Sequence, residues 1–169
     1  FNETGEWQAK INEISKGIVK FSIIKKLREK NKELDLWLAF TPIKSNYFNF
    51  MIQKAAELGV TKFIPIIFDR TIVRKINIER IEKIIIEATE QSNRINIPML
   101  EKPQNLKKFL SNNLKKIDLV FTDLNTTKKK LEINKEANNP LCAIVGPEGD
   151  FTEKERELIL NFKSVNSIN

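Results

Sequence analysis

From residue 34 onward, short apolar runs alternate along the chain with segments of helical periodicity. The apolar runs cover residues 36–40, 62–68, 118–122 and 141–145, and the helical patterns cover residues 47–58, 78–91, 106–111 and 152–160. Strands connected through helices run parallel, and a parallel sheet is covered by helices on both faces. The pattern therefore predicts an α/β fold built on a largely parallel sheet.

The first 40 residues follow a different period. Apolar and polar side chains alternate over residues 7–11 and again over residues 19–23, with Gly17 at a turn between them. This spacing predicts a β-hairpin. Two or three short strands cannot bury a core alone, so we expect them to be part of a small β-domain. The sequence starts with Phe1 and has no basic-then-apolar leader, so we expect the natural chain to begin earlier.

The composition is that of a globular protein, with 41% hydrophobic and 30% charged residues. No apolar stretch approaches the roughly 18 residues of a membrane span. Cys142 is the only cysteine, which fits the reducing cytoplasm, and the sequence contains no histidine. Without histidine, Ser-His and Cys-His catalysis and the commonest zinc ligand are excluded. We expect a cytoplasmic protein with no metal and no membrane contact.

The formal net charge of +7 has two explanations. Lysine and arginine that neutralise phosphates supply most of the non-specific affinity of proteins for nucleic acids. Lysine, isoleucine and asparagine are also abundant together, and AT-rich coding produces the same bias. The charge alone leaves both explanations open.

The segment Gly146-Pro147-Glu148-Gly149 is the strongest candidate for a ligand loop. It holds two of only five glycines and lies between a predicted strand and a predicted helix. Thr152 and Glu155 form a capping box at the start of that helix. Ligands of open α/β sheets bind at the carboxyl ends of strands, which is where this loop lies. We expect the ligand to approach the backbone so closely here that a Cβ at Gly149 would block binding without unfolding the protein. An ordinary strand-to-helix turn is the alternative.

The charge of this loop indicates the class of ligand. Phosphate-binding loops offer amides and lysine, whereas this loop carries Glu148 and Asp150, and the strand over residues 118–122 is followed by Asp123. Neither G-x-G-x-x-G nor the P-loop motif is present. A cationic ligand without phosphate, such as S-adenosylmethionine with its sulfonium, is compatible with such a crevice.

Several charged residues need partners. Glu57 lies in the last turn of a predicted helix, where the macrodipole disfavours an anion, so we expect Lys54 or an arginine beside it. Glu87, Gln91 and Arg94 follow i, i+4, i+7 spacing and are expected on one helix face; a solvated face with a Glu90–Arg94 pair is the alternative. Arginine is scarce in this lysine-rich chain.

Four segments together resemble a known family. They are "LAFTPIK" at residues 38–44, "QKAAELGVTKFIPII" at 53–67, "EATEQSNR" at 87–94 and "VGPEGDFTEKE" at 145–155. In this order they are similar to the RsmE-type 16S rRNA (uracil-N3) methyltransferases of the SPOUT superfamily. "FNETGEW" at residues 1–7 resembles the late part of that family's N-terminal domain.

The resemblance implies a SPOUT-type trefoil-knot parallel sheet in residues 34–169 and a partial PUA-like, RNA-binding β-barrel in residues 1–33. The sequence of residues 162–169 predicts the end of a helix followed by a strand. The resemblance implies that the family's knot segment would follow Asn169. The resemblance also implies a homodimer that acts on 16S rRNA in the 30S subunit. Asp150 departs from the family, which usually has glycine there.

The cofactor-binding residues follow from the same resemblance. Those expected to bind S-adenosylmethionine are Thr122, Asp123, Leu124, Val145, Gly146, Pro147, Glu148, Gly149 and Phe151. The residues expected to contact RNA come instead from the chain's own composition: Arg70, Arg74 and Arg94 stand out because arginine is scarce among its many lysines. No catalytic residue is assigned, because the proton on uracil N3 could leave to a carboxylate, through water, or from an anion stabilised by arginine.

The function so implied is methyl transfer from S-adenosylmethionine to N3 of a uridine in the decoding region of 16S rRNA. A non-catalytic RNA-binding or ribosome-assembly module of the same fold is the alternative, supported by the net charge and by Asp150. A nucleotide-phosphate enzyme is disfavoured by the acidic loop and by the missing glycine motifs.

Overall fold

The computed structural model describes residues 4–30, 33–123, 126 and 139–168. Its strands are β1 (Glu6–Ser15), β2 (Ile18–Arg28), β3 (Leu36–Phe40), β4 (Lys62–Ile67), β5 (Met99–Leu100), β6 (Gln104–Asn105), β7 (Asp118–Thr122), β8 (Leu141–Val145) and β9 (Val165–Ile168). Its helices are α1 (Ser45–Glu57), α2 (Ile78–Gln91), α3 (Leu106–Asn113) and α4 (Glu153–Leu160). Each helix and strand predicted after residue 34 is present within about two residues of its expected bounds.

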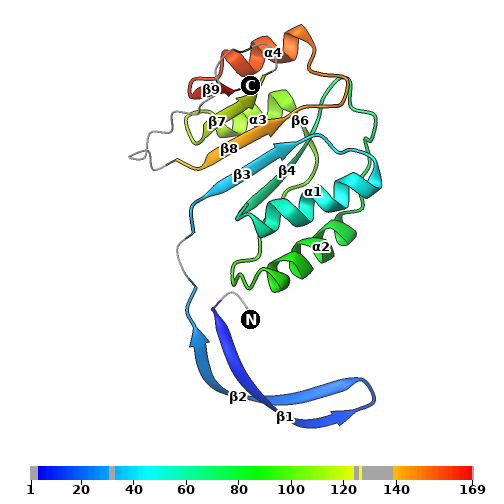
Figure 1. Ribbon diagram of the computed structural model, residues 1–169, viewed down its shortest axis with the longest axis vertical. Helices are drawn as coiled ribbons and strands as arrows, with labels where there is room; N and C mark the ends of the chain where they lie inside the picture. The colour runs from blue at the N-terminus through cyan, green and yellow to red at the C-terminus, as the bar shows by residue number, and fades with distance from the viewer. Residues whose placement is uncertain (1–3, 31–32, 124–125, 127–138, 169) are drawn as a thin grey trace.

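The main sheet has the strand order β5-β4-β3-β8-β7-β9, with β6 pairing with β4, and its pairings in the described part of the chain are all parallel. This confirms the predicted α/β class. The strand order reverses between β3 and β8, because the chain builds outward from β3 on one side and returns to β8 on the other (Figure 1). Ligands of parallel sheets bind at such a reversal, outside the carboxyl ends of the strands.

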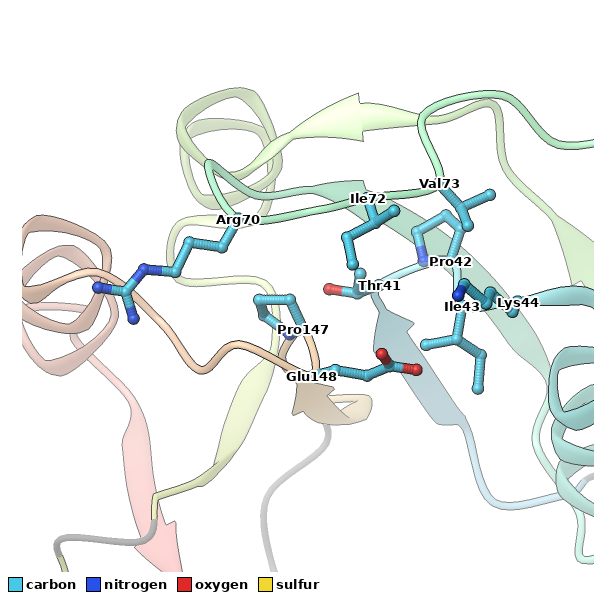
Figure 2. A pocket seen from close by; sticks show the side chains of 9 residues that line it. All are labelled: Thr41, Pro42, Ile43, Lys44, Arg70, Ile72, Val73, Pro147 and Glu148. Atoms are coloured by element: carbon cyan, nitrogen blue, oxygen red, sulfur yellow. The ribbon is translucent and has the colours of Figure 1, made fainter.

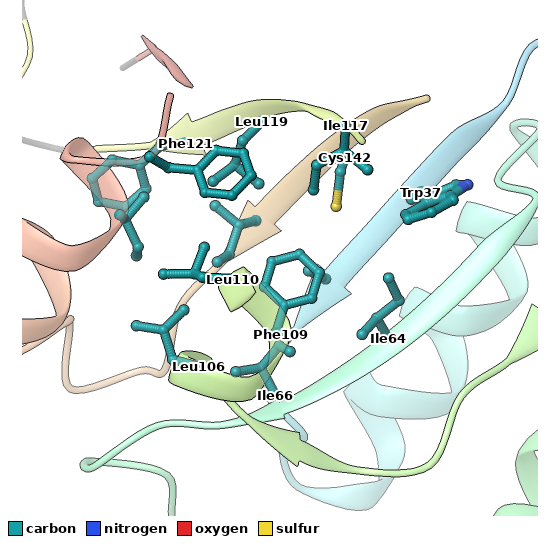
Figure 3. Packing of buried hydrophobic residues seen from close by; sticks show 14 of the residues in the cluster. Trp37, Ile64, Ile66, Leu106, Phe109, Leu110, Ile117, Leu119, Phe121 and Cys142 are labelled. Carbon is teal, nitrogen blue, oxygen red and sulfur yellow. The ribbon is translucent and has the colours of Figure 1, made fainter. Parts of the chain in front are cut away.

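Side chains of β3 alternate between two cores, one on each face of the sheet. Trp37 and Ala39 belong to the core that includes Phe109 of α3, whereas Phe40 belongs to the core that includes Phe48 of α1. Figure 3 shows the first of these cores, closed by α3. Because both faces are buried, the central strands β3, β4 and β8 are apolar at nearly every position.

Helical spacing explains how α1 and α2 cover the second face. Their buried residues fall three or four positions apart, at Phe48, Ile52 and Ala56 in α1 and at Ile81, Ile85 and Ala88 in α2. The two helices lie side by side on the same side of the sheet (Figure 1). Because each follows a parallel strand, both begin at the carboxyl edge of the sheet.

The hairpin predicted around Gly17 is present, with β1 and β2 antiparallel. Lys16 and Gly17 have φ angles of 45° and 82°, the left-handed pair that a two-residue hairpin turn requires. Arg28 joins the hairpin to the α/β part by donating to the Asn93 side chain at 2.8 Å. The PUA-like barrel, the trefoil knot and the domain boundary between residues 33 and 34 stay predictions.

Cys142 is fully buried in the middle of β8. Burial raises the pKa of its thiol from 9.0 to about 12, because a thiolate would lose its hydration there. We therefore expect Cys142 to resist thiol reagents at pH 8 in the native protein and to react at once in denaturant. Between about pH 9 and pH 12 the unfolded chain releases this proton while the folded chain keeps it, so the free energy of unfolding should fall.

A pH series of denaturant melts, run beside Cys142→Ala, separates this contribution from lysine and tyrosine titration. The variant should lose less stability than the parent across the same pH range. Rapid labelling of the native thiol at pH 8 would contradict the buried position.

Candidate functional site

The candidate site lies where β3 and β8 end side by side. The Thr41 amide donates to the Val145 carbonyl at 3.2 Å, which extends the ladder one residue past the strands. Pro147 and Glu148 then pass over the end of β3, and Figure 2 shows them gathered with Thr41 while the Arg70 side chain extends away. The glycine-containing loop therefore occupies the reversal point of the sheet, as its sequence position predicts.

Gly146 is the glycine that the fold requires. A Cβ on Gly146 would lie 2.4 Å from Cζ of Phe151. The Phe151 ring cannot retreat, because it is buried edge-on against Phe68 and Phe121 at centroid distances of 5.1 and 5.0 Å. At Gly149 the nearest atom to a Cβ is Cδ of Arg70 at 3.7 Å, which is ordinary contact. Gly149 therefore has room for a Cβ within the protein itself, and the close approach of a ligand expected at this glycine stays a prediction.

The backbone conformation of Asp150 accounts for an aspartate at a position where the family usually has glycine. The φ angle of Asp150 is 62°, a left-handed conformation that favours glycine. Aspartate tolerates this conformation better than most residues because its short side chain can bond locally. Here Oδ1 accepts from the Phe151 amide at 2.8 Å, and Oδ2 accepts from Arg156 at 3.1 Å. The acid keeps the loop shape that a glycine would give.

Arg156, which sequence reasoning missed, joins the two acidic parts of the site. Its guanidinium donates to the buried Asp123 carboxylate just past β7 and to Asp150 in the loop. It also lies 5.9 Å from the centroid of the Phe121 ring. An arginine in the first turn of α4 opposes the helix dipole, so a nearby acid could have been expected from the sequence.

Glu155, the neighbour of Arg156, anchors the same helix to β4. The predicted capping box is present: Thr152 Oγ1 accepts from the Glu155 amide at 3.3 Å, and the Glu155 carboxylate accepts from the Thr152 amide at 2.9 Å. The carboxylate also accepts from the Asp69 amide at 2.8 Å, just after β4. The first turn of α4 thus fixes the ends of β4 and β7 and the loop together.

A cavity of about 300 Å³ opens beside this network. Its lining is Thr122, Asp123, Gly146, Pro147, Asp150, Phe151 and Ile168. Two carboxylates against the single guanidinium of Arg156 leave an excess of negative charge in its wall.

The structure brings five of the predicted cofactor residues together in this cavity: Thr122, Asp123, Gly146, Pro147 and Phe151. Glu148 lines a neighbouring hollow, and Gly149 accepts a bond from Arg70. Val145 is 40% exposed at the end of β8. Leu124 lies outside the described residues.

The three arginines predicted to contact RNA differ in their surroundings. Arg70 and Arg74 are exposed on the loop after β4, and each donates to a backbone carbonyl, Gly149 at 2.8 Å and Asp69 at 3.0 Å. Arg94 instead donates to the Ala56 and Val60 carbonyls at the end of α1 and pairs with Glu33.

Helix α2 ends at Gln91, and Asn93 has a left-handed φ of 57°, so Arg94 does not continue the face that carries Glu87. The alternative Glu90–Arg94 pair is also replaced, because Arg94 pairs with Glu33. Arg94 therefore stabilises the junction of α1 and α2.

The expected partner of Glu57 is confirmed. Lys54 Nζ lies 2.7 Å from the Glu57 carboxylate and lowers its pKa, and the Gln53 side chain donates to the same carboxylate at 2.9 Å.

The described residues offer neither a metal site nor a membrane-spanning helix. No group of three acidic or cysteine side chains there could hold a metal ion. No helix in that part of the chain is long and apolar enough to cross a membrane.

Fold and site together define an α/β protein whose ligand cavity is acidic and lies at the carboxyl edge of a parallel sheet. The family described as RNA methyltransferase domain matches residues 29–169. A ribosomal RNA small subunit methyltransferase E from Rickettsia conorii is 36% identical over 99% of this chain and 70% of its own. One from Aquifex aeolicus is 30% identical over 92% of this chain and 70% of its own.

Solved structures agree on the fold. A ribosomal RNA small subunit methyltransferase E from Neisseria gonorrhoeae, bound to S-adenosyl methionine, has a TM-score of 0.85 at 24% identity and covers 96% of this chain and 68% of its own. A putative methyltransferase from Legionella pneumophila with bound cofactor SAM has a TM-score of 0.77 at 27% identity, over 99% of this chain and 71% of its own. The chain belongs to the RNA methyltransferase domain family and, within it, to the ribosomal RNA small subunit methyltransferase E family.

The two loop glycines should respond differently to an added methyl group. Gly146→Ala forces a Cβ into the Phe151 ring, so we expect it to cost about 1–3 kcal/mol of unfolding free energy, as overpacking does. Gly149→Ala, the matched control, should change stability by no more than about 0.5 kcal/mol. Denaturant melts of both variants measure the difference, and equal stabilities would contradict the loop geometry.

Arg156→Ala should be strongly destabilising. It removes the cation of a buried ion pair, and loss of one partner in such a pair costs about 3–5 kcal/mol. The double variant Asp123→Ala/Arg156→Ala should be less destabilised than the sum of the two single variants. Additive losses in a double-mutant cycle at pH 7 would show that the pair contributes no coupling.

Proposed function

We propose that this chain methylates N3 of a uridine in the decoding region of 16S rRNA in the 30S subunit, with S-adenosylmethionine as methyl donor. Family membership supports S-adenosylmethionine-dependent methylation of small-subunit rRNA. The bound cofactor in two similar structures supports the donor. The choice of uridine N3 and of the decoding region rests on the sequence resemblance.

The observation that carries the cofactor assignment is the acid-lined cavity beside Gly146. A Cβ at this glycine would clash with the buried Phe151 ring, so only glycine lets the loop lie against Phe151 where both residues line the cavity. Asp123 and Asp150 outnumber Arg156, which suits a sulfonium and disfavours a phosphate. When bound, the cofactor supplies an electrophilic methyl group. We propose Thr122, Asp123, Gly146, Pro147 and Phe151 as its principal contacts.

The chain's main contribution to the reaction is positioning. Attack by a ring nitrogen on a methyl group is an in-line displacement, and holding both partners in a near-attack geometry supplies several kcal/mol in general. Arg156 and Glu155 fix the loop relative to the ends of β7 and β4. The loop can therefore hold one geometry without rearranging during the reaction.

On the RNA side we propose Arg70 and Arg74. Both are exposed on the loop that borders Gly149, so phosphate oxygens can reach them from solvent. We assign no RNA contact to Arg94, because its guanidinium is held by three groups of the protein. From the resemblance we also propose that the protein is a homodimer, that its α/β part contains a trefoil knot, and that residues 1–33 belong to a PUA-like barrel.

Calorimetry with S-adenosylmethionine and mass analysis of rRNA nucleosides test the proposal together. We expect binding with one site per chain, and 3-methyluridine in 16S rRNA that disappears from cells lacking the gene and returns on complementation. Gly149→Ala is the folded control in both measurements, because a Cβ at Gly149 meets only the Arg70 side chain, at an ordinary contact distance. RNA binding without cofactor binding would favour the non-catalytic RNA-binding module instead.

A further inference from the structure

Three cations line a second hollow, outside the cofactor cavity. Lys44, Lys75 and Arg80 come from the loop before α1, the loop before α2 and the first turn of α2. The hollow has a volume of about 400 Å³, and the rest of its lining is apolar or amide, with no acidic side chain. It therefore concentrates positive charge on a concave surface.

These cations have no protein partner within the described part of the chain. All three are exposed, and none forms an ion pair or side-chain hydrogen bond there. Lys54 and Lys62 on the neighbouring elements, by contrast, pair with Glu57 and Glu101. The fold thus leaves the charges of this hollow available to a ligand.

Helix α1 adds to the positive potential. Its N-cap is Lys44, whose side chain has no acceptor for the first-turn amides, and the first turn contains no acidic residue. A cation at this position opposes the helix dipole and lowers stability. Helix α2, which begins beside it, has the usual arrangement: the Asn77 side chain accepts from the Arg80 amide at 3.0 Å, and Glu79 lies in the first turn. An anion in the hollow would offset the unfavourable charge arrangement at the start of α1.

The hollow adjoins the site already described. It shares Ile43, Lys44 and Val73 with the small hollow of Figure 2, which Glu148 and Pro147 also line. Pro147 in turn lines the cofactor cavity. The three hollows therefore follow one another along the carboxyl edge of the sheet.

We propose that Lys44, Lys75 and Arg80 bind backbone phosphates of the RNA substrate and so lead the strand toward the cofactor cavity. The proposal rests on the proposed function, because it takes RNA as the substrate. No glycine-rich loop encloses the hollow as a nucleotide phosphate site would require, and its open, three-cation lining suits successive phosphates of a chain.

The triple variant Lys44→Gln/Lys75→Gln/Arg80→Gln tests this directly. Its affinity for a 16S rRNA transcript should fall, and the slope of log K against log[KCl] should become shallower by about 0.7 for each lost single-strand contact, or about 2 in all. The control Lys102→Gln/Lys108→Gln/Lys116→Gln removes the same charge from exposed positions elsewhere and should change the slope much less. Affinity for S-adenosylmethionine should stay the same in both.

The outcomes separate the two proposals. If the parent protein fails to bind S-adenosylmethionine, the proposed function fails, whatever the salt slopes show. If it binds the cofactor and methylates rRNA but the two triple variants have equal slopes, the assignment of this hollow is wrong. Tight binding of inorganic phosphate there, with rRNA affinity unchanged by the substitutions, would also overturn it.

The substitution Lys44→Asp separates RNA binding from a purely structural role of Lys44, because it should change stability and RNA affinity in opposite directions. Lys44→Asp supplies α1 with a favoured N-cap, so the melting temperature should rise. The same change places an anion in the hollow, so rRNA affinity should fall. A variant that is more stable and binds RNA as well as the parent would contradict the proposal.

Discussion

The rest of the site depends on the ion pairs that the Arg156 guanidinium forms with Asp123 and Asp150. Arg156 bonds Asp123 at the end of β7 and Asp150 in the loop, while its neighbour Glu155 bonds the Asp69 amide after β4. One helical turn thus fixes three loops that come from distant parts of the chain. Because the bonds to Asp123 are buried, they keep their strength where water would otherwise weaken them. The walls of the cavity are therefore held together by one shared anchor.

The two helix starts at the carboxyl edge use opposite electrostatics. Helix α4 begins with a capping box and two acids, so its amides and dipole are satisfied within the protein. Helix α1 begins with Lys44 and has neither. The first arrangement stabilises the fold around the cofactor cavity, whereas the second gives up stability and leaves positive potential on the surface. Binding surfaces often sacrifice stability in this way.

Periodicity predicted the four helices and the strands β3, β4, β7 and β8 because each lies within one continuous, strongly patterned segment. The two-residue strands β5 and β6 are too short to show a period, and they were not predicted. The site was predicted less completely, because its contacts join distant residues. The clash that makes Gly146 necessary comes from a ring held by Phe68 and Phe121, so no loop motif could distinguish it from Gly149. Arg94 resembled a surface arginine, but its carbonyl partners lie 38 and 34 residues away in the chain.

The placement of Lys44 also bears on the origin of the positive charge. A coding bias toward lysine fills exposed positions without regard to helix polarity, and selection for stability would then remove lysine from an N-cap, where it opposes the dipole. Lys44 nevertheless occupies that position, in a hollow shared with Lys75 and Arg80 and adjoining the loop of Glu148. Part of the +7 net charge therefore lies where the fold disfavours it and an RNA backbone would favour it.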